Sequence, residues 1–166
     1  MECSAPKIAQ FIAKQSTHVQ EPATRVVLGK WAEQDGKIAG YVGEAKANGG
    51  IWYQTEAGFY EAVGKDSNLA WKTNEAFLQQ QLTNGVPRLE FHGFDVAGDM
   101  ASFAGKPFEQ LPARLKEFVW LQENGSKFGY VQQGTTFVKA AEGSGVASGL
   151  GQAGVAGEAV SSSTRQ

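Results

Sequence analysis

The apolar run TRVVLGKW, from Thr24 to Trp31, constrains the fold more than any other stretch of the chain. Its apolar residues are consecutive rather than alternating, and a glycine closes the run. A strand with only one covered face alternates apolar and polar residues, so a continuous run predicts a strand that is buried on both faces. Strands of this kind lie in parallel sheets that are covered by helices. The run therefore favours an α/β fold.

The rest of the chain alternates between helical and strand patterns. Apolar spacing and turn residues predict helices over 7–15, 36–50, 55–64, 67–85 and 112–125, strands over 51–55 and 87–93, and a hairpin over 127–140. Residues 94–107 pattern as a glycine-punctuated connection, and Ser67 as a helix cap. Strands separated by helices favour crossover connections, so we expect a mixed, largely parallel sheet of about five strands, flanked by helices and ending in a β-hairpin.

The length and the local composition predict a single folded domain with two extensions. The chain has 166 residues, enough for one domain with a hydrophobic core. Residues 1–23 read as a lead-in helix and linker, and residues 24–140 as the catalytic domain. Residues 141–166 are rich in Gly, Ala and Ser and lack aromatic residues, which is typical of a disordered tail.

The residue counts exclude several classes of function. One cysteine, Cys3, and two histidines, His18 and His92, allow neither a disulfide framework nor a Cys-based or His-rich metal site, so no metal and no cofactor are expected. A net charge of −2 and a pI of about 5.7 do not favour general binding to nucleic acid, although a nuclease needs only a local basic groove. No apolar run is long enough to span a membrane and no signal peptide is visible, so no membrane partner is expected.

The predicted topology indicates where a site lies. Ligands of open parallel sheets bind beyond the carboxyl ends of the strands. Those ends are predicted at Lys30 and Trp31, at Thr55, and at His92. We therefore expect these four residues near the site.

Trp71 and Asn74 are three residues apart in the predicted helix over 67–85, so they share a face. One interpretation is a core tryptophan beside a polar neighbour. The other is an aromatic platform with an amide beside it, which suits a flat heterocycle such as nicotinamide or a nucleobase. The sequence leaves both open.

His92 ends the third predicted strand and could act as a general acid or base, with Asp95 orienting it. Lys30 and Arg88 could neutralise a phosphate group. The alternative is a capped or partly buried histidine with a structural role. The stretch AVGKDS, residues 62–67, contains a Gly-Lys pair but lacks the upstream glycine and the strand of a P-loop. It is therefore not interpreted as a phosphate-binding loop.

Glu117 lies at the edge of the apolar face of the helix in RLKEFVWLQENGSKFGY, which runs from Arg114 to Tyr130. It is either a solvated carboxylate paired with Arg114, of small energetic value, or a carboxylate held at the rim of a pocket for chemistry. Ser102 and Phe103, in the connection before this helix, could contact a ligand.

Four stretches resemble the C-terminal toxin domains of bacterial polymorphic toxins of the contact-dependent inhibition and Rhs type. They are VVLG from Val26, ANGGIWYQT from Ala47, AWKTNEAFLQQQLTNG from Ala70 and EFVWLQENGSKFGYVQQGTTFVK from Glu117. The resemblance implies a toxin in bacterial competition that is delivered as part of an exported protein and acts in the cytoplasm of the target cell. It also implies a cognate immunity protein as partner.

A second resemblance concerns the activity. The order of the Trp71 helix, the strand over 89–91, Ser102-Phe103 and Glu117 is similar to the ADP-ribosyl cyclase and NAD glycohydrolase superfamily. It implies a hydrolase that cleaves the nicotinamide–ribose bond, with NAD as substrate, Glu117 as catalytic carboxylate and Trp71 as stacking residue. The chemistry suits a chain poor in His and Cys, because one carboxylate can stabilise an oxocarbenium-like state.

Three hypotheses stay open at this point. The first is this NAD-consuming toxin. The second is a metal-independent toxin that cleaves RNA, such as tRNA, in which His92, Glu90, Arg88 and Lys30 supply the acid, the base and the cations. The third is a binding domain without enzymatic activity, in which the aromatic residues all belong to the core.

Overall fold

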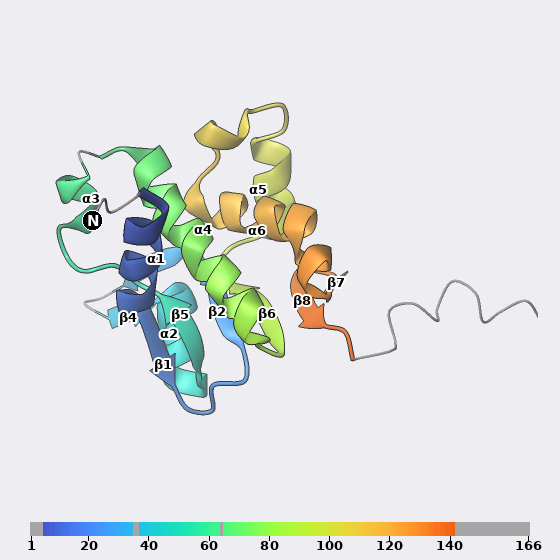
Figure 1. The fold of residues 1–166 in the computed structure, drawn as a ribbon. Coiled ribbons are helices and arrows are strands. Elements are labelled where there is room, and N and C mark those ends of the chain that lie inside the picture. Colours follow the sequence, from blue (N-terminus) through green and yellow to red (C-terminus); the bar gives the residue numbers. More distant parts are fainter. Residues whose placement is uncertain (1–4, 35–36, 64, 142–166) are drawn as a thin grey trace, which may run out of the picture.

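The computed structural model describes residues 5–34, 37–63 and 65–141, shown in colour in Figure 1. Within these residues, six strands form a mixed sheet in the order β1-β5-β2-β6-β8-β7. Their bounds are Thr17–Gln20 (β1), Gly50–Tyr53 (β5), Val26–Gly29 (β2), Arg88–His92 (β6), Thr136–Lys139 (β8) and Tyr130–Gln133 (β7). The three central strands are parallel, while β1, β8 and β7 pair antiparallel at the two sides. This arrangement confirms the predicted α/β class and its closing hairpin.

Helices cover both faces of the sheet (Figure 1). The helical elements are α1 (Ala5–Gln15), α2 (Gly40–Asn48), α3 (Phe59–Ala62), α4 (Ser67–Asn84), α5 (Val96–Ser102), η1 (Phe108–Gln110), α6 (Ala113–Asn124) and η2 (Gly125–Phe128). On one face, α2 packs against Val27 and Trp52 through Val42 and Ala45. On the other face lies the larger core, to which α1, α4 and α6 contribute. The sheet is therefore the middle of three layers.

The run that predicted a buried strand forms β2, at the centre of the sheet. Val26 and Val27 are fully buried and Leu28 is nearly so, with consecutive side chains facing opposite layers. Burying each of them stabilises the fold by roughly 1.5–3 kcal/mol. Gly29 ends the strand at φ 134°, and a Cβ there would lie 2.0 Å from the carbonyl oxygen of His92. Only glycine permits this approach of β2 to the end of β6.

Helix α4 forms where the sequence predicts the clearest helix, and its apolar stripe of Trp71, Leu78 and Leu82 is buried. Its cap is Asp66 rather than Ser67, because the Asp66 carboxylate accepts from the first free N–H groups, those of residues 68 and 69. Gly85, in the left-handed conformation, ends the helix.

Several elements differ from the expected boundaries. Residues 17–20, expected within a lead-in, pair with β5 as β1. A small ribbon of β3 (Trp31–Gln34) and β4 (Lys37–Ala39) precedes a shortened α2. Helix α5 lies within the expected connection over 94–107. The partner of β1 is distant in the chain, and β3, β4 and α5 are too short for a clear periodic pattern, so local patterns do not reveal them. The tail expected over 141–166 lies outside the described residues, except for residue 141. None of the described helices has the length and apolar character that a membrane span requires.

Candidate functional site

A pocket of about 360 Å³ lies beyond the carboxyl end of β5, between α3, the start of α4 and the start of α6. Its wall includes Tyr53, Thr55, Trp71, Asn74, Pro112 and Lys116. Three of the predicted binding residues, Thr55, Trp71 and Asn74, therefore meet in one cavity. Its position agrees with the rule that sites in such sheets lie past the strand ends.

Glu117 lies directly behind the pocket wall. The residue is only 6% exposed, and its Oε1 accepts a hydrogen bond of 2.8 Å from Nδ2 of Asn74. The other atoms of the pair, Oε2 of Glu117 and Oδ1 of Asn74, are also sealed from solvent and have no hydrogen-bond partner among the described residues. Arg114, the expected ion-pair partner, instead binds Asp99. The solvated-pair interpretation of Glu117 is therefore wrong.

The environment of Glu117 determines its protonation. Burial raises the pKa of its carboxyl group to about 8, and the hydrogen bond from Asn74 offsets part of that rise. In the free protein the carboxyl is therefore largely protonated at neutral pH. A group whose pKa lies this close to neutrality can exchange a proton during a reaction.

Two tyrosines extend the polar cluster around Glu117. Burial raises the pKa of Tyr41, and the negative charge of Glu117 adds to the rise. Burial likewise raises the pKa of Tyr53 to about 12, where the hydrogen bond to Thr73 opposes the rise and Glu117 adds to it. The Tyr41 hydroxyl donates to the carbonyl oxygen of Tyr53 at 2.7 Å, and the Tyr53 hydroxyl shares a 2.7 Å bond with Thr73. Both phenols stay protonated and act as neutral hydrogen-bonding groups.

Sequence reasoning missed Tyr41 and Tyr53. Tyr53 lies in the predicted strand over 51–55, and Tyr41 lies in the predicted helix over 36–50. The rule that placed Thr55 at the site applies equally to Tyr53, because both lie at the carboxyl end of β5. No comparable signal marks Tyr41, which reaches the cluster from the opposite layer.

Trp71 is both a core residue and an aromatic wall of the pocket, so the two interpretations of this residue apply together. It is 7% exposed and belongs to the main core, where its ring meets Phe108 edge-on at a centroid distance of 5.3 Å. It also lines the pocket beside Asn74. The tryptophan thus supplies a rigid aromatic wall, fixed by core packing, at the mouth of the Glu117 cluster.

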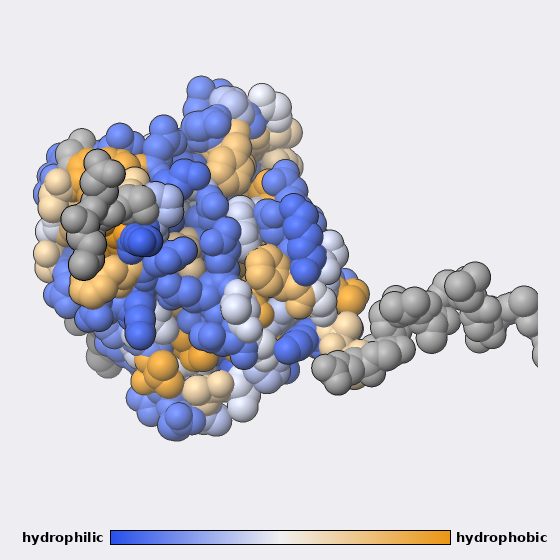
Figure 2. Space-filling view, viewed as in Figure 1, coloured by the Kyte–Doolittle hydropathy of each residue, from blue (hydrophilic) through white to orange (hydrophobic). Residues whose placement is uncertain are grey.

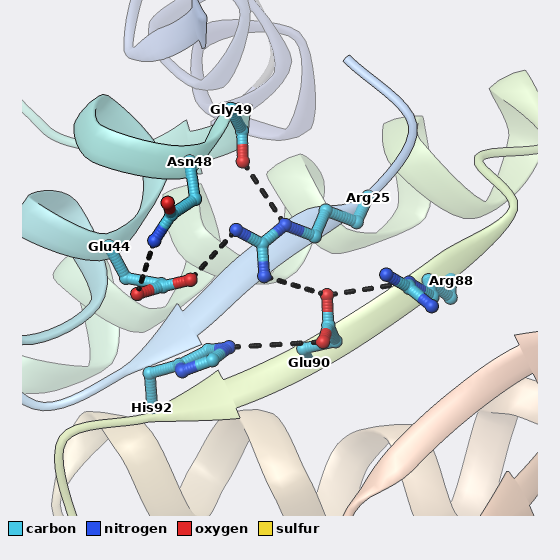
Figure 3. A network of polar contacts seen from close by, with 7 residues as sticks. All are labelled: Arg25, Glu44, Asn48, Gly49, Arg88, Glu90 and His92. Carbon is cyan, nitrogen blue, oxygen red and sulfur yellow. Dashed lines mark hydrogen bonds and ion pairs between the residues drawn. The ribbon is translucent and has the colours of Figure 1, made fainter. Parts of the chain in front are cut away.

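His92 and Glu90 lie on the other face of the sheet, under α2 (Figure 3). In β6, Leu89 and Phe91 point into the main core, so the alternating Glu90 and His92 point to the α2 side. The acidic neighbour of His92 is Glu90, whose Oε1 lies 3.9 Å from Nε2, rather than Asp95. The two residues predicted as catalytic, Glu117 and His92, are therefore not brought together.

Glu90 belongs to a charged network around Arg25 (Figure 3). The Arg25 guanidinium donates to Glu90 at 3.0 Å and to Glu44 at 2.9 Å, and Arg88 approaches Glu90 at 3.4 Å. The hydrogen bond from Arg25 holds the pKa of Glu44 below its usual value. Since each carboxylate has a cationic partner, the network is electrostatically balanced.

The other predicted site residues lie outside the pocket. Lys30 and Trp31 are exposed past the end of β2, where Trp31 meets the edge of Tyr41 at 6.4 Å between centroids. Ser102 is exposed and donates to a carbonyl within α5, and Phe103 follows that helix. Ser102 and Phe103 are not part of the pocket wall.

A larger hollow of about 640 Å³ lies between α1, α3 and α4, away from these groups. Its wall is mainly apolar, and Ile8 on α1 and Leu69 on α4 are exposed beside it, in the region where Figure 2 shows apolar surface. None of the sealed, unpaired polar atoms of the described residues belongs to its wall. Volume alone does not make a reaction site, so we assign the candidate site to the smaller pocket.

Among the described residues, no cluster of three or more His, Cys, Asp or Glu side chains is arranged to hold a metal ion. Comparisons with protein-family models, with curated proteins and with solved structures find no match to this chain. The pocket and the carboxyl group behind it are therefore the features of the described residues that point to a function.

Proposed function

We propose that this chain is a toxin domain of the hydrolase class that cleaves the nicotinamide–ribose bond of NAD, with Glu117 as its catalytic carboxyl. The observation that carries the proposal is the sealed Glu117–Asn74 pair, in which each partner keeps one unbonded oxygen directly behind an aromatic pocket. Buried oxygens without hydrogen-bond partners lower the stability of the folded protein, and proteins tolerate such losses mainly at functional sites.

The pocket wall offers groups that fit nicotinamide. The ring of Trp71 can cover a flat heterocycle. Oδ1 of Asn74 is sealed in the free protein, so we propose that the pocket wall opens on binding and lets this oxygen accept a hydrogen bond from the carboxamide NH₂ group. Because Nδ2 of the same amide holds Glu117, Asn74 links substrate recognition to the catalytic carboxyl.

Substrate binding also changes the charge of Glu117. The nicotinamide ring of NAD is cationic, and a positive charge nearby lowers the pKa of a carboxyl group. Starting from about 8, the pKa of Glu117 falls on binding, so the carboxyl gives up its proton when the cation arrives. The resulting carboxylate stabilises the positive charge that develops on the ribose.

The reaction balances without a further reagent. The bond between ribose C1′ and the ring nitrogen breaks, and its electron pair leaves with neutral nicotinamide. Water adds to C1′ and passes a proton to the Glu117 carboxylate, which restores the resting state. The products are nicotinamide, ADP-ribose and one proton per NAD and water consumed.

The test is release of nicotinamide from NAD, followed by chromatography. We expect release by the wild type and a fall of roughly 10²–10³-fold in kcat for Glu117→Gln, which keeps the shape and removes the ionisable group. Glu123→Gln is the matched control, because Glu123 lies exposed on the same helix. Full activity of a folded Glu117→Gln protein, or no release by the wild type, would overturn the proposal.

The rival hypothesis of RNA cleavage finds less support, because the carboxylate beside His92 already binds Arg25 and Arg88. A tRNA-cleavage assay with His92→Ala separates it from the NAD reaction. If the domain is a toxin, we propose that it acts in the cytoplasm of a target cell, after delivery as part of an exported protein. A cognate immunity protein that blocks the pocket follows from the same proposal.

A further inference from the structure

Lys116 is a buried cation that the proposed reaction does not use. The residue is only 4% exposed and lines the same pocket as Trp71 and Asn74. Its amine has neither a hydrogen bond nor an ion pair among the described residues, and its contact is with the ring of Phe108, 5.8 Å from the centroid. Burial lowers the pKa of Lys116, because desolvation disfavours the charged form, and the negative charge of Glu109 opposes part of that fall. An ammonium group in this position lacks the partner that buried charges normally have.

The place of Lys116 in α6 is also electrostatically unfavourable. Lys116 is the fourth residue of the helix, and side chains in a helix point toward its N-terminus. The N-terminus carries partial positive charge and favours anions. The first turn of α6 has no acidic residue, and Pro112 provides no capping side chain. Arg114, the other cation in this turn, forms an ion pair with Asp99, whereas Lys116 has no ion pair among the described residues and is influenced only through space by Glu109.

The start of α6 faces the pocket. Pro112 and Ala113 line the wall together with Lys116, one helical turn away. Thr55 and Ser67 add hydroxyl groups to the same wall, and no acidic side chain occurs among its described residues. The Lys116 ammonium, an uncapped helix N-terminus and two hydroxyls therefore converge on this wall, and none of the residues that line it is an anion that could pair with them.

We infer that this part of the pocket is a phosphate subsite and that Lys116 is its specificity-determining residue. The ligand class is a small phosphorylated riboside, because a phosphate group bound there would match both the ammonium and the helix N-terminus. The inference deepens the proposed function and rests on it in one respect: it assigns to Lys116 the phosphate attached to the ribose that Glu117 acts on.

The subsite can be tested by binding alone, without turnover. ADP-ribose and ribose 5-phosphate are titrated into the intact protein by calorimetry, with unphosphorylated ribose as the reference ligand. We expect Lys116→Met to weaken binding of both phosphorylated probes by about 10–100-fold, as loss of a charge-assisted hydrogen bond implies. Ribose binding should not change. Lys106→Met, at an exposed position outside the pocket, is the matched control and should bind like the wild type.

A second readout separates binding from folding. Because Lys116→Met removes an unpaired buried charge, the free variant should melt at or above the wild-type temperature while losing the phosphate response. ADP-ribose should raise the melting temperature of the wild type and of Lys106→Met but not that of Lys116→Met or Lys116→Gln. If Lys116→Met does not fold, Lys116→Gln shows whether the binding of ADP-ribose depends on the charge of Lys116.

The outcomes distinguish the subsite from the proposed reaction. If NAD is not cleaved but ADP-ribose binds in a Lys116-dependent way, the subsite stands and the NAD proposal fails. If NAD is cleaved and the Lys116 variants bind ADP-ribose like the wild type, the reaction stands and the subsite is wrong. Equal affinity of the wild type for ribose and ribose 5-phosphate also overturns the inference.

Discussion

Two groups of glutamates, on opposite faces of the same sheet, show how differently one residue type can be held. On the α2 face, Glu44 and Glu90 share the guanidinium of Arg25, and the pKa of Glu44 lies below its usual value. On the other face, Glu117 has one neutral donor, Asn74, and its pKa rises to about 8. The first group is charged and compensated, while the second avoids charge by keeping its proton.

The difference separates a structural role from a reactive one. A compensated network fixes the positions of α2, β2 and β6, and removing one partner would leave a buried charge. An uncompensated carboxyl contributes little to stability as a charged group, but it can change protonation near neutral pH.

The largest loss of stability from a substitution should follow from Arg25→Met. Without the guanidinium, Glu44 and Glu90 lie close together with reduced compensation, so we expect the free energy of unfolding to fall by roughly 3 kcal/mol. Urea denaturation measures it. Arg88→Met is the control, since the Arg88 side chain is 52% exposed, and its effect should stay within about 0.5 kcal/mol. Equal losses in both variants would show that Arg25 contributes no more to stability than the exposed Arg88.

The next effect is a pH dependence that belongs to Glu117. Its pKa is higher in the folded state than the ordinary 4.5, so the folded protein holds the proton more tightly than the unfolded chain. Stability from this group is full below pH 4.5 and is lost as pH rises toward 8, at about 1.4 kcal/mol per pH unit. Unfolding of Glu117→Gln should lack this slope, whereas Glu123→Gln should keep it. A slope shared by all three proteins would contradict the assignment.

A smaller effect should come from Asn74→Leu. The amide of Asn74 lowers the pKa of Glu117, so its loss should move the carboxyl titration further above 8, by the equivalent of roughly 1 kcal/mol. Carbon-13 NMR of the glutamate carboxyl groups measures the shift. Gln79→Leu, at an exposed position of the same helix, should leave the titration in place.

The smallest effect concerns Glu44, whose contribution to stability should depend on pH in the opposite direction to that of Glu117. The folded-state pKa of Glu44 is lowered, so its stabilisation is present above the unfolded pKa of about 4.5 and is lost as pH falls through the folded pKa. Glu44→Gln should therefore cost less than about 1 kcal/mol at pH 7, and the difference from the wild type should vanish in acid. Denaturant titrations at pH 7 and pH 3 compare the two. A difference that grows in acid would reverse the assigned sign.

Local sequence patterns predicted those features of the fold that are determined by residues close together in the chain. The unbroken apolar run of β2 predicted its burial on both faces, and helical spacing predicted that Trp71 and Asn74 share a face. The strand-end rule predicted that Thr55 borders a site. In each case the information lies within a few residues of the feature itself.

Features that depend on distant partners could not be predicted in the same way. The period of a strand puts Glu90 and His92 on one face, but only packing decides that this face is the α2 side rather than the Glu117 side. Likewise, the pairing of β1 with β5 depends on a free edge whose existence no local pattern records. The depth of Glu117 depends on α4, more than forty residues away in the chain.

The hydrogen bond from the Tyr41 hydroxyl to the last carbonyl of β5 has a consequence for communication across the sheet. Helix α2 carries both Tyr41, which interacts electrostatically with Glu117, and Glu44, which is bonded to Arg25. A displacement of α2 therefore alters the surroundings of both carboxyl groups at once. By thermodynamic reciprocity, a ligand that shifts α2 changes the proton affinity of Glu117, and a proton leaving Glu117 changes the affinity for that ligand by the same factor.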